Sequence, residues 1–324
     1  MRRLIAREAL SLDDYRLETI EAPAPDQGQV RIRVAACSLG YVDGLMAVGG
    51  YQVKPPLPYT PGSDIAGTVD AVGEGVPADW IGARVVAQVR FGLCDYTLAP
   101  AAALNRIPKN VAFETAAVFH TNYTTALHGL QDRAAIAPGE RLLVFGAAGG
   151  VGSAAMDVGR ALGAEVIAVG STPEKRAFAL EHGAAHVLDT APQGFRDRLK
   201  AVTDGKGPDV IFDPVCGPLF EPAFRSLAWR GRHLVVGFVG GPIPALPSNL
   251  PLMKGAALLG VDIRQFPIFE TATAAANLRT LLGWLGEGRL RPAVGKVFAL
   301  EDYAQALDLA MSGAGFGKAV IRLD

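Results

Sequence analysis

Hydrophobic residues in the middle of the chain fall into short runs that are separated by longer amphipathic segments. The run Leu142–Phe145 precedes a stretch of small residues that ends near Leu162, and a second run follows at Val166–Val169. Further apolar runs lie at His186–Leu188, Val210–Phe212, His233–Gly237 and Ala256–Val261, with helical patterns at 152–162, 173–182, 194–203 and 219–228. Strands that alternate with helices in this way predict an α/β fold with a doubly wound parallel sheet.

The first 110 residues have a different pattern. Val30–Val34 alternates apolar and polar residues, which is the period of a half-buried strand. Ile65–Val72 and Arg84–Val89 predict further strands between turn glycines. The segment 55–62 contains four prolines and predicts a rigid loop. Helical patterns follow at 114–133, 271–286 and 301–312, and a final apolar run at Lys318–Leu323 is expected to return to this first, β-rich domain.

Composition narrows the class of protein. A chain of 324 residues that is 50% hydrophobic and 19% charged suits two ordinary domains with large cores. The net charge of −1 offers no general attraction to nucleic acid or to acidic membranes, so neither partner is expected. The three cysteines are far apart, and acidic residues follow the basic start before any signal-peptide core. Since no run of 18 apolar residues occurs, we expect a soluble, cytoplasmic protein.

The segment Gly146–Gly152 lies between an apolar run and a helical pattern, which is the context of a dinucleotide-binding loop. Its glycines would let the backbone approach a pyrophosphate, and the following helix N-terminus favours an anion. Ala147 stands where the first glycine of G-x-G-x-x-G is usual. A tight structural turn is the alternative interpretation; the flanking strands favour a dinucleotide site.

The residues after the second apolar run indicate which coenzyme binds. NAD-type folds place an acid about 20 residues after the loop, to bind the ribose. Gly170, Ser171 and Thr172 stand there instead, followed by Lys175 and Arg176. An acid would repel a 2′-phosphate, whereas a hydroxyl and two cations would hold one, so the sequence predicts NADPH over NADH. The alternative is that the two cations are merely the solvated face of a helix.

A second stretch carries a family resemblance. Pro58–Gly67, followed by Val69, Val72-Gly73 and Gly82–Val85, resembles the medium-chain dehydrogenase/reductase superfamily, and within it the zinc-free quinone oxidoreductase (zeta-crystallin-like) branch. This resemblance implies a GroES-like catalytic domain from residues 1–122 and 263–324 and a Rossmann NADPH-binding domain at 123–262. It also implies a homodimer joined through the strand near 256–261.

The resemblance also predicts that no metal is bound. Zinc-dependent relatives supply Cys, His and Cys to a catalytic zinc, and the matching positions here are Cys37, Ser63 and Thr121. Their structural zinc uses four neighbouring cysteines, whereas this chain has three in all. His120 and His128 are eight residues apart, two turns on a helix and too far for one metal.

Without a Lewis acid, the chemistry should suit an acceptor that is already electron-poor. The expected reaction is hydride transfer from NADPH to a quinone. One alternative is a reductase of an enone or enoyl thioester on the same scaffold, although the first domain shows no evident basic cluster for coenzyme A phosphates. Another is a crystallin-like NADPH-binding protein with a structural or RNA-binding role.

Pocket residues are expected from both domains, in the cleft between them. The candidates are residues 39–43, Tyr51, Tyr59, Phe91 and Arg264–Phe269. Tyr41 and Tyr51 are candidates to stack on a flat acceptor or to donate a hydrogen bond, with ordinary packing as the favoured alternative for either. Asp43 is a candidate proton donor, with a structural bond to backbone favoured. Gly40 replaces an asparagine common in the family, which removes a polar contact near the nicotinamide or the substrate.

The resemblance also implies the coenzyme contacts. Thr125, Gly149, Gly150, Val151 and Gly152 should flank the pyrophosphate, and Ser171, Lys175 and Arg176 should contact the 2′-phosphate. Gly237 and Phe238 should lie beside the nicotinamide ribose, with Val215 and an inert Cys216 on the adenine side.

Overall fold

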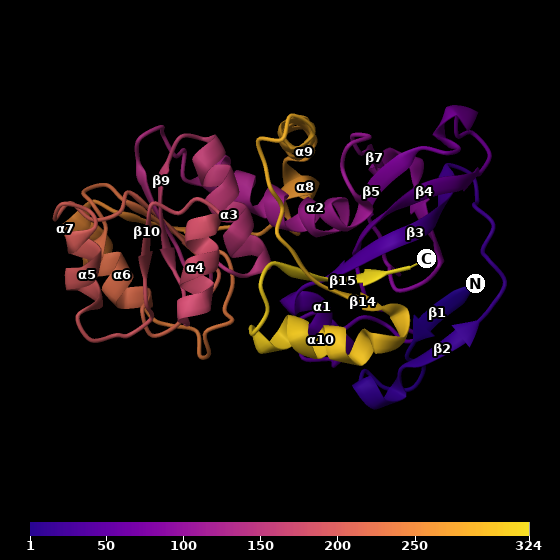
Figure 1. The fold of residues 1–324 in the computed structure, drawn as a ribbon, viewed down its shortest axis with the longest axis horizontal. Coiled ribbons are helices and arrows are strands. Elements are labelled where there is room, and N and C mark those ends of the chain that lie inside the picture. The colour runs from indigo at the N-terminus through magenta and orange to yellow at the C-terminus, as the bar shows by residue number, and fades with distance from the viewer. Residues whose placement is uncertain (324) are drawn as a thin grey trace. The chain divides into compact units, whose positions relative to one another are not determined.

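The computed structural model describes residues 1–323, which form two compact units (Figure 1). The first unit comprises residues 1–120 together with the C-terminal segment from Ala293, and the second comprises residues 121–292. The division falls within helix α2 (Phe113–Leu127). Within residues 1–323, no helix is both long enough and apolar enough to cross a membrane.

The second unit is built on a six-stranded parallel sheet in the order β10-β9-β8-β11-β12-β13. Its strands are β8 (Arg141–Val144), β9 (Glu165–Val169), β10 (His186–Leu188), β11 (Val210–Asp213), β12 (Arg232–Val235) and β13 (Ala257–Gly260). Strand β9 lies on one side of β8 and β11 on the other, so the direction of sheet growth reverses at β8. The predicted doubly wound α/β sheet is confirmed, and its switch point lies where ligands bind in such sheets.

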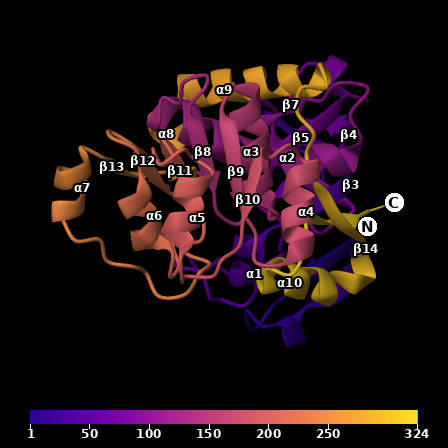
Figure 2. The same cartoon turned by 60° about the vertical axis from the view of Figure 1, so that its left-hand side comes forward.

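Helices connect these strands (Figure 2). The connecting helices are α3 (Gly150–Ala161), α4 (Pro173–Glu181), α5 (Phe195–Ala201), α6 (Phe220–Ser226) and α7 (Asn249–Lys254), and two further helices, α8 (Phe266–Phe269) and α9 (Thr271–Gly286), follow the last strand of this sheet. The central strands are buried and read as continuous apolar runs, as parallel strands do when helices cover both faces. A Cβ at Gly159 of α3 would lie 2.4 Å from Leu142 Cδ2, so this glycine lets the helix pack closely on β8.

The first unit contains a seven-stranded sheet in which β14-β15-β3-β4-β5-β7 follow in order and β6 pairs with β3. Its strands are β3 (Gln29–Leu39), β4 (Asp64–Val72), β5 (Arg84–Gln88), β6 (Tyr96–Pro100), β7 (Asn105–Arg106), β14 (Val294–Ala299) and β15 (Lys318–Arg322). Strand β15 runs antiparallel to β3, so the C-terminal segment completes the sheet begun by the N-terminal one (Figure 1). This is the β-rich, GroES-like domain that was expected.

Smaller elements complete the first unit. A separate hairpin pairs β1 (Arg2–Ile5) with β2 (Arg16–Thr19), and helix α1 (Tyr41–Ala47) packs beside α10 (Tyr303–Ser312). Single turns of 3-10 helix lie at η1 (Leu12–Asp14), η2 (Ala78–Trp80), η3 (Ala101–Ala103) and η5 (Leu300–Asp302), while η4 (His128–Arg133) of the second unit is a π-helix. The short helix α1 carries the predicted pocket residues 41–43.

Residues 263–292 differ from the expected division of the chain, which assigned them to the first domain. In the structure they pack on the second unit. The Phe266 ring stacks on His128 with centroids 3.7 Å apart, and Asn277 Nδ2 donates to Asp132 Oδ2 at 2.7 Å. An amphipathic pattern shows that a helix has a buried face but not which domain that face covers, so the contacts with η4 could not be read from the sequence.

Candidate functional site

Three loops meet at the carboxyl ends of β8, β11 and β12. The loop after β11 contacts the loop after β12, because Gly240 N donates to Val215 O at 2.8 Å. A Cβ at Gly146, just after β8, would lie 3.4 Å from Val215 Cγ2. These loops carry the residues predicted for the coenzyme site, Gly149–Gly152, Val215, Gly237 and Phe238. The structure therefore brings these residues together at the edge of the sheet where open α/β folds bind ligands.

The glycine loop after β8 is tightly folded. Gly146 has φ of +59°, and Gly149 N donates to Gly146 O at 2.9 Å. A Cβ at Gly152 would lie 2.1 Å from that same carbonyl oxygen, so no other residue fits this turn without displacing it. Helix α3 begins at Gly150, and the N–H groups of a first helical turn lack acceptors within the helix. A phosphate fits this cradle, because its oxygens would accept from these groups.

Asp213 fixes the neighbouring loop after β11. Its Oδ1 accepts from Val215 N at 2.9 Å and from Cys216 N at 2.8 Å, while its Oδ2 lies 3.1 Å from His233 Nε2. Asp213 and His233 are both buried. Burial also raises the pKa of the Cys216 thiol to about 12, so this thiol is un-ionised at neutral pH. Sequence reasoning gave no role to Asp213 or His233; an acid at the end of a buried strand was the available signal.

Thr125 of α2 is buried, and its hydroxyl is already engaged. The Oγ1 atom donates to Thr121 O at 2.6 Å, within the same helix. The lone pairs of that oxygen remain able to accept a hydrogen bond.

The end of β9 is shaped by Gly170. A Cβ there would lie 3.0 Å from Arg176 Cγ and 3.1 Å from Arg176 N, so a side chain at this position would require Arg176 to shift by a few tenths of an ångström. Arg176 Nη1 donates to Gly170 O at 2.9 Å, and Thr172 Oγ1 accepts from Lys175 N at 3.3 Å. Ser171 is exposed. The structure thus places Ser171, Lys175 and Arg176 in one turn after β9.

Glu174 lies within this turn. A hydrogen bond from Thr172 lowers the pKa of its carboxyl, which is therefore ionised at neutral pH. Glu174 is exposed in the first turn of α4.

In the first unit, Asp43 lies in the first turn of α1. Its Oδ2 accepts from Gly40 N at 2.8 Å, and its Oδ1 accepts from Ser63 Oγ at 3.1 Å. Asp43 is 7% exposed, whereas Ser63 is partly exposed. Burial raises the pKa of Asp43 against the opposing effects of the Lys318 charge and of these hydrogen bonds.

A buried ion pair lies beside Asp43. Lys318 Nζ of β15 donates to Asp64 Oδ2 of β4 at 2.8 Å, and His120 Nδ1 lies 3.9 Å from Asp64 Oδ1. Burial favours the neutral amine of Lys318, but the Asp64 and Asp43 carboxylates outweigh this effect and raise its pKa. Burial lowers the pKa of His120, which favours the neutral imidazole. The site therefore combines two carboxyl groups with one ammonium group.

Gly40 gives Lys318 its space. A Cβ on Gly40 would lie 3.2 Å from Lys318 Cε and 3.5 Å from Asp43 Oδ2. The asparagine that the resemblance led us to expect there would compete with the lysine stem for this volume.

The tyrosines differ in their surroundings. Tyr41 begins α1 and Tyr51 follows it in a bend; both are partly exposed, and neither hydroxyl has a hydrogen-bond partner among residues 1–323. Tyr59 is a core residue, and burial raises the pKa of its hydroxyl. Tyr41 and Tyr51 therefore retain free hydroxyl groups in this unit, as a pocket residue requires.

The three positions matched to zinc ligands, Cys37, Ser63 and Thr121, have surroundings of other kinds. Cys37 is buried, and its Sγ packs against two glycines. A Cβ added to Gly62 would lie 2.5 Å from this sulfur, and one added to Gly92 would lie 2.8 Å from it. Ser63 donates to Asp43, and Thr121 lies in α2. Within residues 1–323, no group of three or more His, Cys, Asp and Glu side chains is arranged to hold a metal ion.

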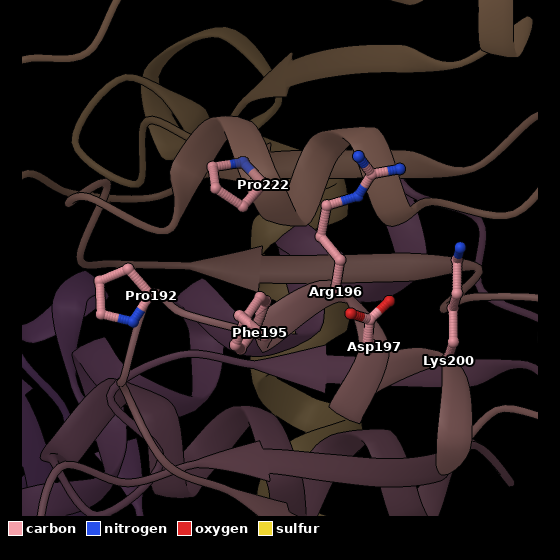
Figure 3. A pocket seen from close by; sticks show the side chains of 7 residues that line it. Pro192, Phe195, Arg196, Asp197, Lys200 and Pro222 are labelled. Atoms are coloured by element: carbon pink, nitrogen blue, oxygen red, sulfur yellow. The ribbon is translucent and has the colours of Figure 1, made fainter.

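A surface cavity of about 330 Å³ lies away from these residues, between α5 and the start of α6 (Figure 3). Its lining includes Arg196, Asp197 and Lys200 of α5 and Pro222 of α6. Asp197 lies among the cations, and no residue predicted for the coenzyme or the acceptor lines the cavity.

Comparison with known proteins identifies the family. Residues 26–143 match the alcohol dehydrogenase GroES-like domain, and residues 150–278 match the zinc-binding dehydrogenase family. The chain is 35% identical over 305 residues to quinone oxidoreductase-like protein 2 of Rattus norvegicus, covering 93% of this chain and 87% of the relative.

Solved structures agree with this fold. An NAD-dependent alcohol dehydrogenase superposes with a TM-score of 0.91 at 27% identity, over the whole of both chains. The quinone oxidoreductase of Thermus thermophilus, solved also with NADPH, gives 0.85 at 31% identity, again over both whole chains. The CurK enoyl reductase gives 0.88 at 25% identity over 99% of this chain and 98% of that one. The chain is therefore an oxidoreductase and belongs to the medium-chain dehydrogenase/reductase superfamily, in its quinone oxidoreductase branch.

Proposed function

We propose that this protein is a metal-free, NADPH-dependent quinone oxidoreductase. The observation that carries the proposal is the pairing of a glycine cradle at β8 with a segment directly after β9, residues 170–173, that contains no acid. The relatives named above support the quinone assignment. A bound NADPH supplies the hydride, and the protein supplies binding and orientation.

The turn after β9 supports the choice of NADPH. The exposed Ser171 hydroxyl and the cations Lys175 and Arg176 would hold a 2′-phosphate, and Gly170 supplies no acid to bind an unphosphorylated ribose. Charge-assisted hydrogen bonds of this kind are about twice as strong as neutral ones. The negative charge of Glu174 in the same turn would repel a phosphate, but the two positive charges of Lys175 and Arg176 exceed it.

The acceptor is expected to be flat and electron-poor, because positioning supplies most of the catalysis. Tyr41 and Tyr51, with partly exposed rings, are the residues proposed to contact it.

An acceptor panel tests the proposal. Steady-state rates with 1,4-benzoquinone, 9,10-phenanthrenequinone, crotonyl-CoA and a simple enone would be compared, each with NADPH and with NADH. We expect the highest kcat/KM for a quinone with NADPH. A preference for NADH would contradict the coenzyme assignment, and tight NADPH binding without turnover would favour a crystallin-like structural role.

Reduction of an enone or an enoyl thioester is the second candidate. The likeness to the CurK enoyl reductase favours it, and the same fold would present the same coenzyme cradle. A higher kcat/KM for crotonyl-CoA than for either quinone would establish this candidate instead.

We also propose that the protein is a homodimer. Strand β13 is one of the two edge strands of the second unit's sheet, opposite β10, and Leu258 on it is 42% exposed. An apolar sheet edge needs cover, and a second copy of the same strand would provide it.

A further inference from the structure

Asp43 and Ser63 form a hydrogen-bonded pair that the proposed coenzyme chemistry does not use. Ser63 Oγ lies 3.1 Å from Asp43 Oδ1, and the two residues come from different elements, α1 and the start of β4. The carboxyl group is 7% exposed, whereas the serine is partly exposed. The pair therefore joins a buried carboxyl group to a hydroxyl group on a more exposed residue.

We propose that Ser63 and Asp43 form a proton relay that protonates the acceptor's carbonyl oxygen as the hydride arrives. This inference rests on the proposed function, because hydride addition to a quinone or an enone leaves an oxyanion that needs a proton. Ser63 would be the catalytic residue that contacts the acceptor, and Asp43 would supply the proton through it.

The charges around Asp43 favour a stored proton. Two carboxyl groups, Asp43 and Asp64, share one buried ammonium group, that of Lys318, so full ionisation would bury an excess negative charge. Lys318 Nζ donates its hydrogen bond to Asp64, and Asp43 interacts with it through charge alone. Because a buried unpaired charge is costly, Asp43 is the group expected to carry a proton.

The other groups facing Asp43 do not supply this proton. Cys37 of β3 and Tyr59 both have pKa values raised by burial, so both stay protonated at neutral pH. Burial lowers the pKa of His120 of α2, which favours its neutral form. Lys318 of β15 and Asp64 of β4 are held in their own ion pair.

The step balances in atoms and electrons. The hydride brings two electrons and one hydrogen nucleus to the acceptor, and NADPH becomes NADP⁺. The Ser63 O–H bond breaks as the acceptor's O–H bond forms, and the proton of Asp43 moves to Ser63 Oγ across their 3.1 Å contact, in which the protonated acid donates to the hydroxyl instead of accepting from it. The resulting Asp43 carboxylate accepts from Gly40 N–H, is stabilised by the Lys318 charge, and regains a proton from solvent.

The test compares two quinones whose reduced anions differ in basicity. The anion from 1,4-benzoquinone is strongly basic, whereas the anion from tetrachloro-1,4-benzoquinone is weakly basic and needs no concerted proton. In single-turnover NADPH oxidation, we expect Ser63→Ala to slow reduction of the first quinone by about 100-fold, the usual scale of general acid catalysis. With the second quinone, the rate of reduction in Ser63→Ala should fall by less than about threefold, because its anion does not need a proton during the hydride transfer.

Two further variants separate a chemical role from a structural one. Ser63→Thr should restore most of the rate because it restores the hydroxyl, and Asp43→Asn should remove the solvent deuterium isotope effect measured with 1,4-benzoquinone. Ser38→Ala is the matched control, because Ser38 is a buried hydroxyl of β3 that donates to Ala117 O instead. NADPH affinity, read by fluorescence titration, should be unchanged in Ser63→Ala.

The outcomes are distinguishable. Equal losses with both quinones, or an isotope effect that persists in Asp43→Asn, would overturn the relay alone. A wild-type enzyme that reduces no carbonyl acceptor would overturn the proposed function together with the relay.

Discussion

At the scale of single residues, the coenzyme assignment depends on what stands at the end of β9. Gly170 is packed against Arg176, and Ser171 is the exposed residue beside it. The absence of an acid at 170–173 was readable in the sequence, but the tight contact between Gly170 and Arg176 required coordinates.

Ser171→Asp should therefore weaken NADPH binding. The new carboxylate would repel the 2′-phosphate and remove a hydroxyl contact, a loss of about 1–3 kcal/mol. Titration of NADPH by fluorescence measures this change, with Gln193→Glu as a control of equal charge at an exposed site of the same unit. An unchanged affinity in Ser171→Asp would place the phosphate elsewhere.

Asp43 should also make stability depend on pH. Burial raises the pKa of Asp43 in the folded state, so between the ordinary carboxyl range and that raised value the folded protein binds more protons than the unfolded chain. The free energy of unfolding then falls as the pH rises through this window.

Asp43→Asn should remove this part of the pH dependence. The variant should therefore lose less free energy of unfolding between pH 4 and pH 7 than the wild type does. Urea unfolding at several pH values measures the effect. Asp308→Asn, at an exposed aspartate of α10, should keep the wild-type slope. A wild-type slope in Asp43→Asn as well would show that the carboxyl is not destabilised by burial.

At the scale of elements, the start of α3 depends on one close approach. A Cβ at Gly152 would lie 2.1 Å from Gly146 O, so an alanine there must displace the loop or the helix. The strand–loop–helix order was evident in the sequence, but only the folded turn shows which glycine is irreplaceable.

Gly152→Ala should weaken NADPH binding by more than about tenfold, or about 1.4 kcal/mol. Isothermal titration measures the affinity. In the control Gly283→Ala on α9, the added Cβ meets open space within 4 Å, and it should stabilise the helix by about 0.5–1 kcal/mol. Equal NADPH affinity in both variants would argue against a tight cradle at Gly146.

At the scale of the whole molecule, the β13 edge of the second unit's sheet is the expected site of assembly. Near β13, apolar side chains are unusually exposed, including Leu252 at 81% and Trp229 at 72%. Exposed apolar side chains that gather in one place are typical of an interaction site.

Leu258→Glu should convert the proposed dimer to a monomer. The carboxylates introduced at position 258 of the two copies would repel each other where the two β13 strands meet. Sedimentation velocity measures the mass in solution. Leu180→Glu, at an exposed leucine of α4, should leave the assembly unchanged. A monomeric wild-type protein would contradict the dimer.

Local features could be predicted from the order of residues: buried strands, the glycine loop between β8 and α3, and the lack of an acid at the end of β9. These features depend on residues close together in the chain, so periodicity and spacing reveal them. Tertiary structure alone decided which distant groups meet. It placed Lys318 beside Asp64, Ser63 beside Asp43, and residues 263–292 on the second unit. Such contacts depend on how separate elements pack, and the periodicity of one segment carries no information about its partner.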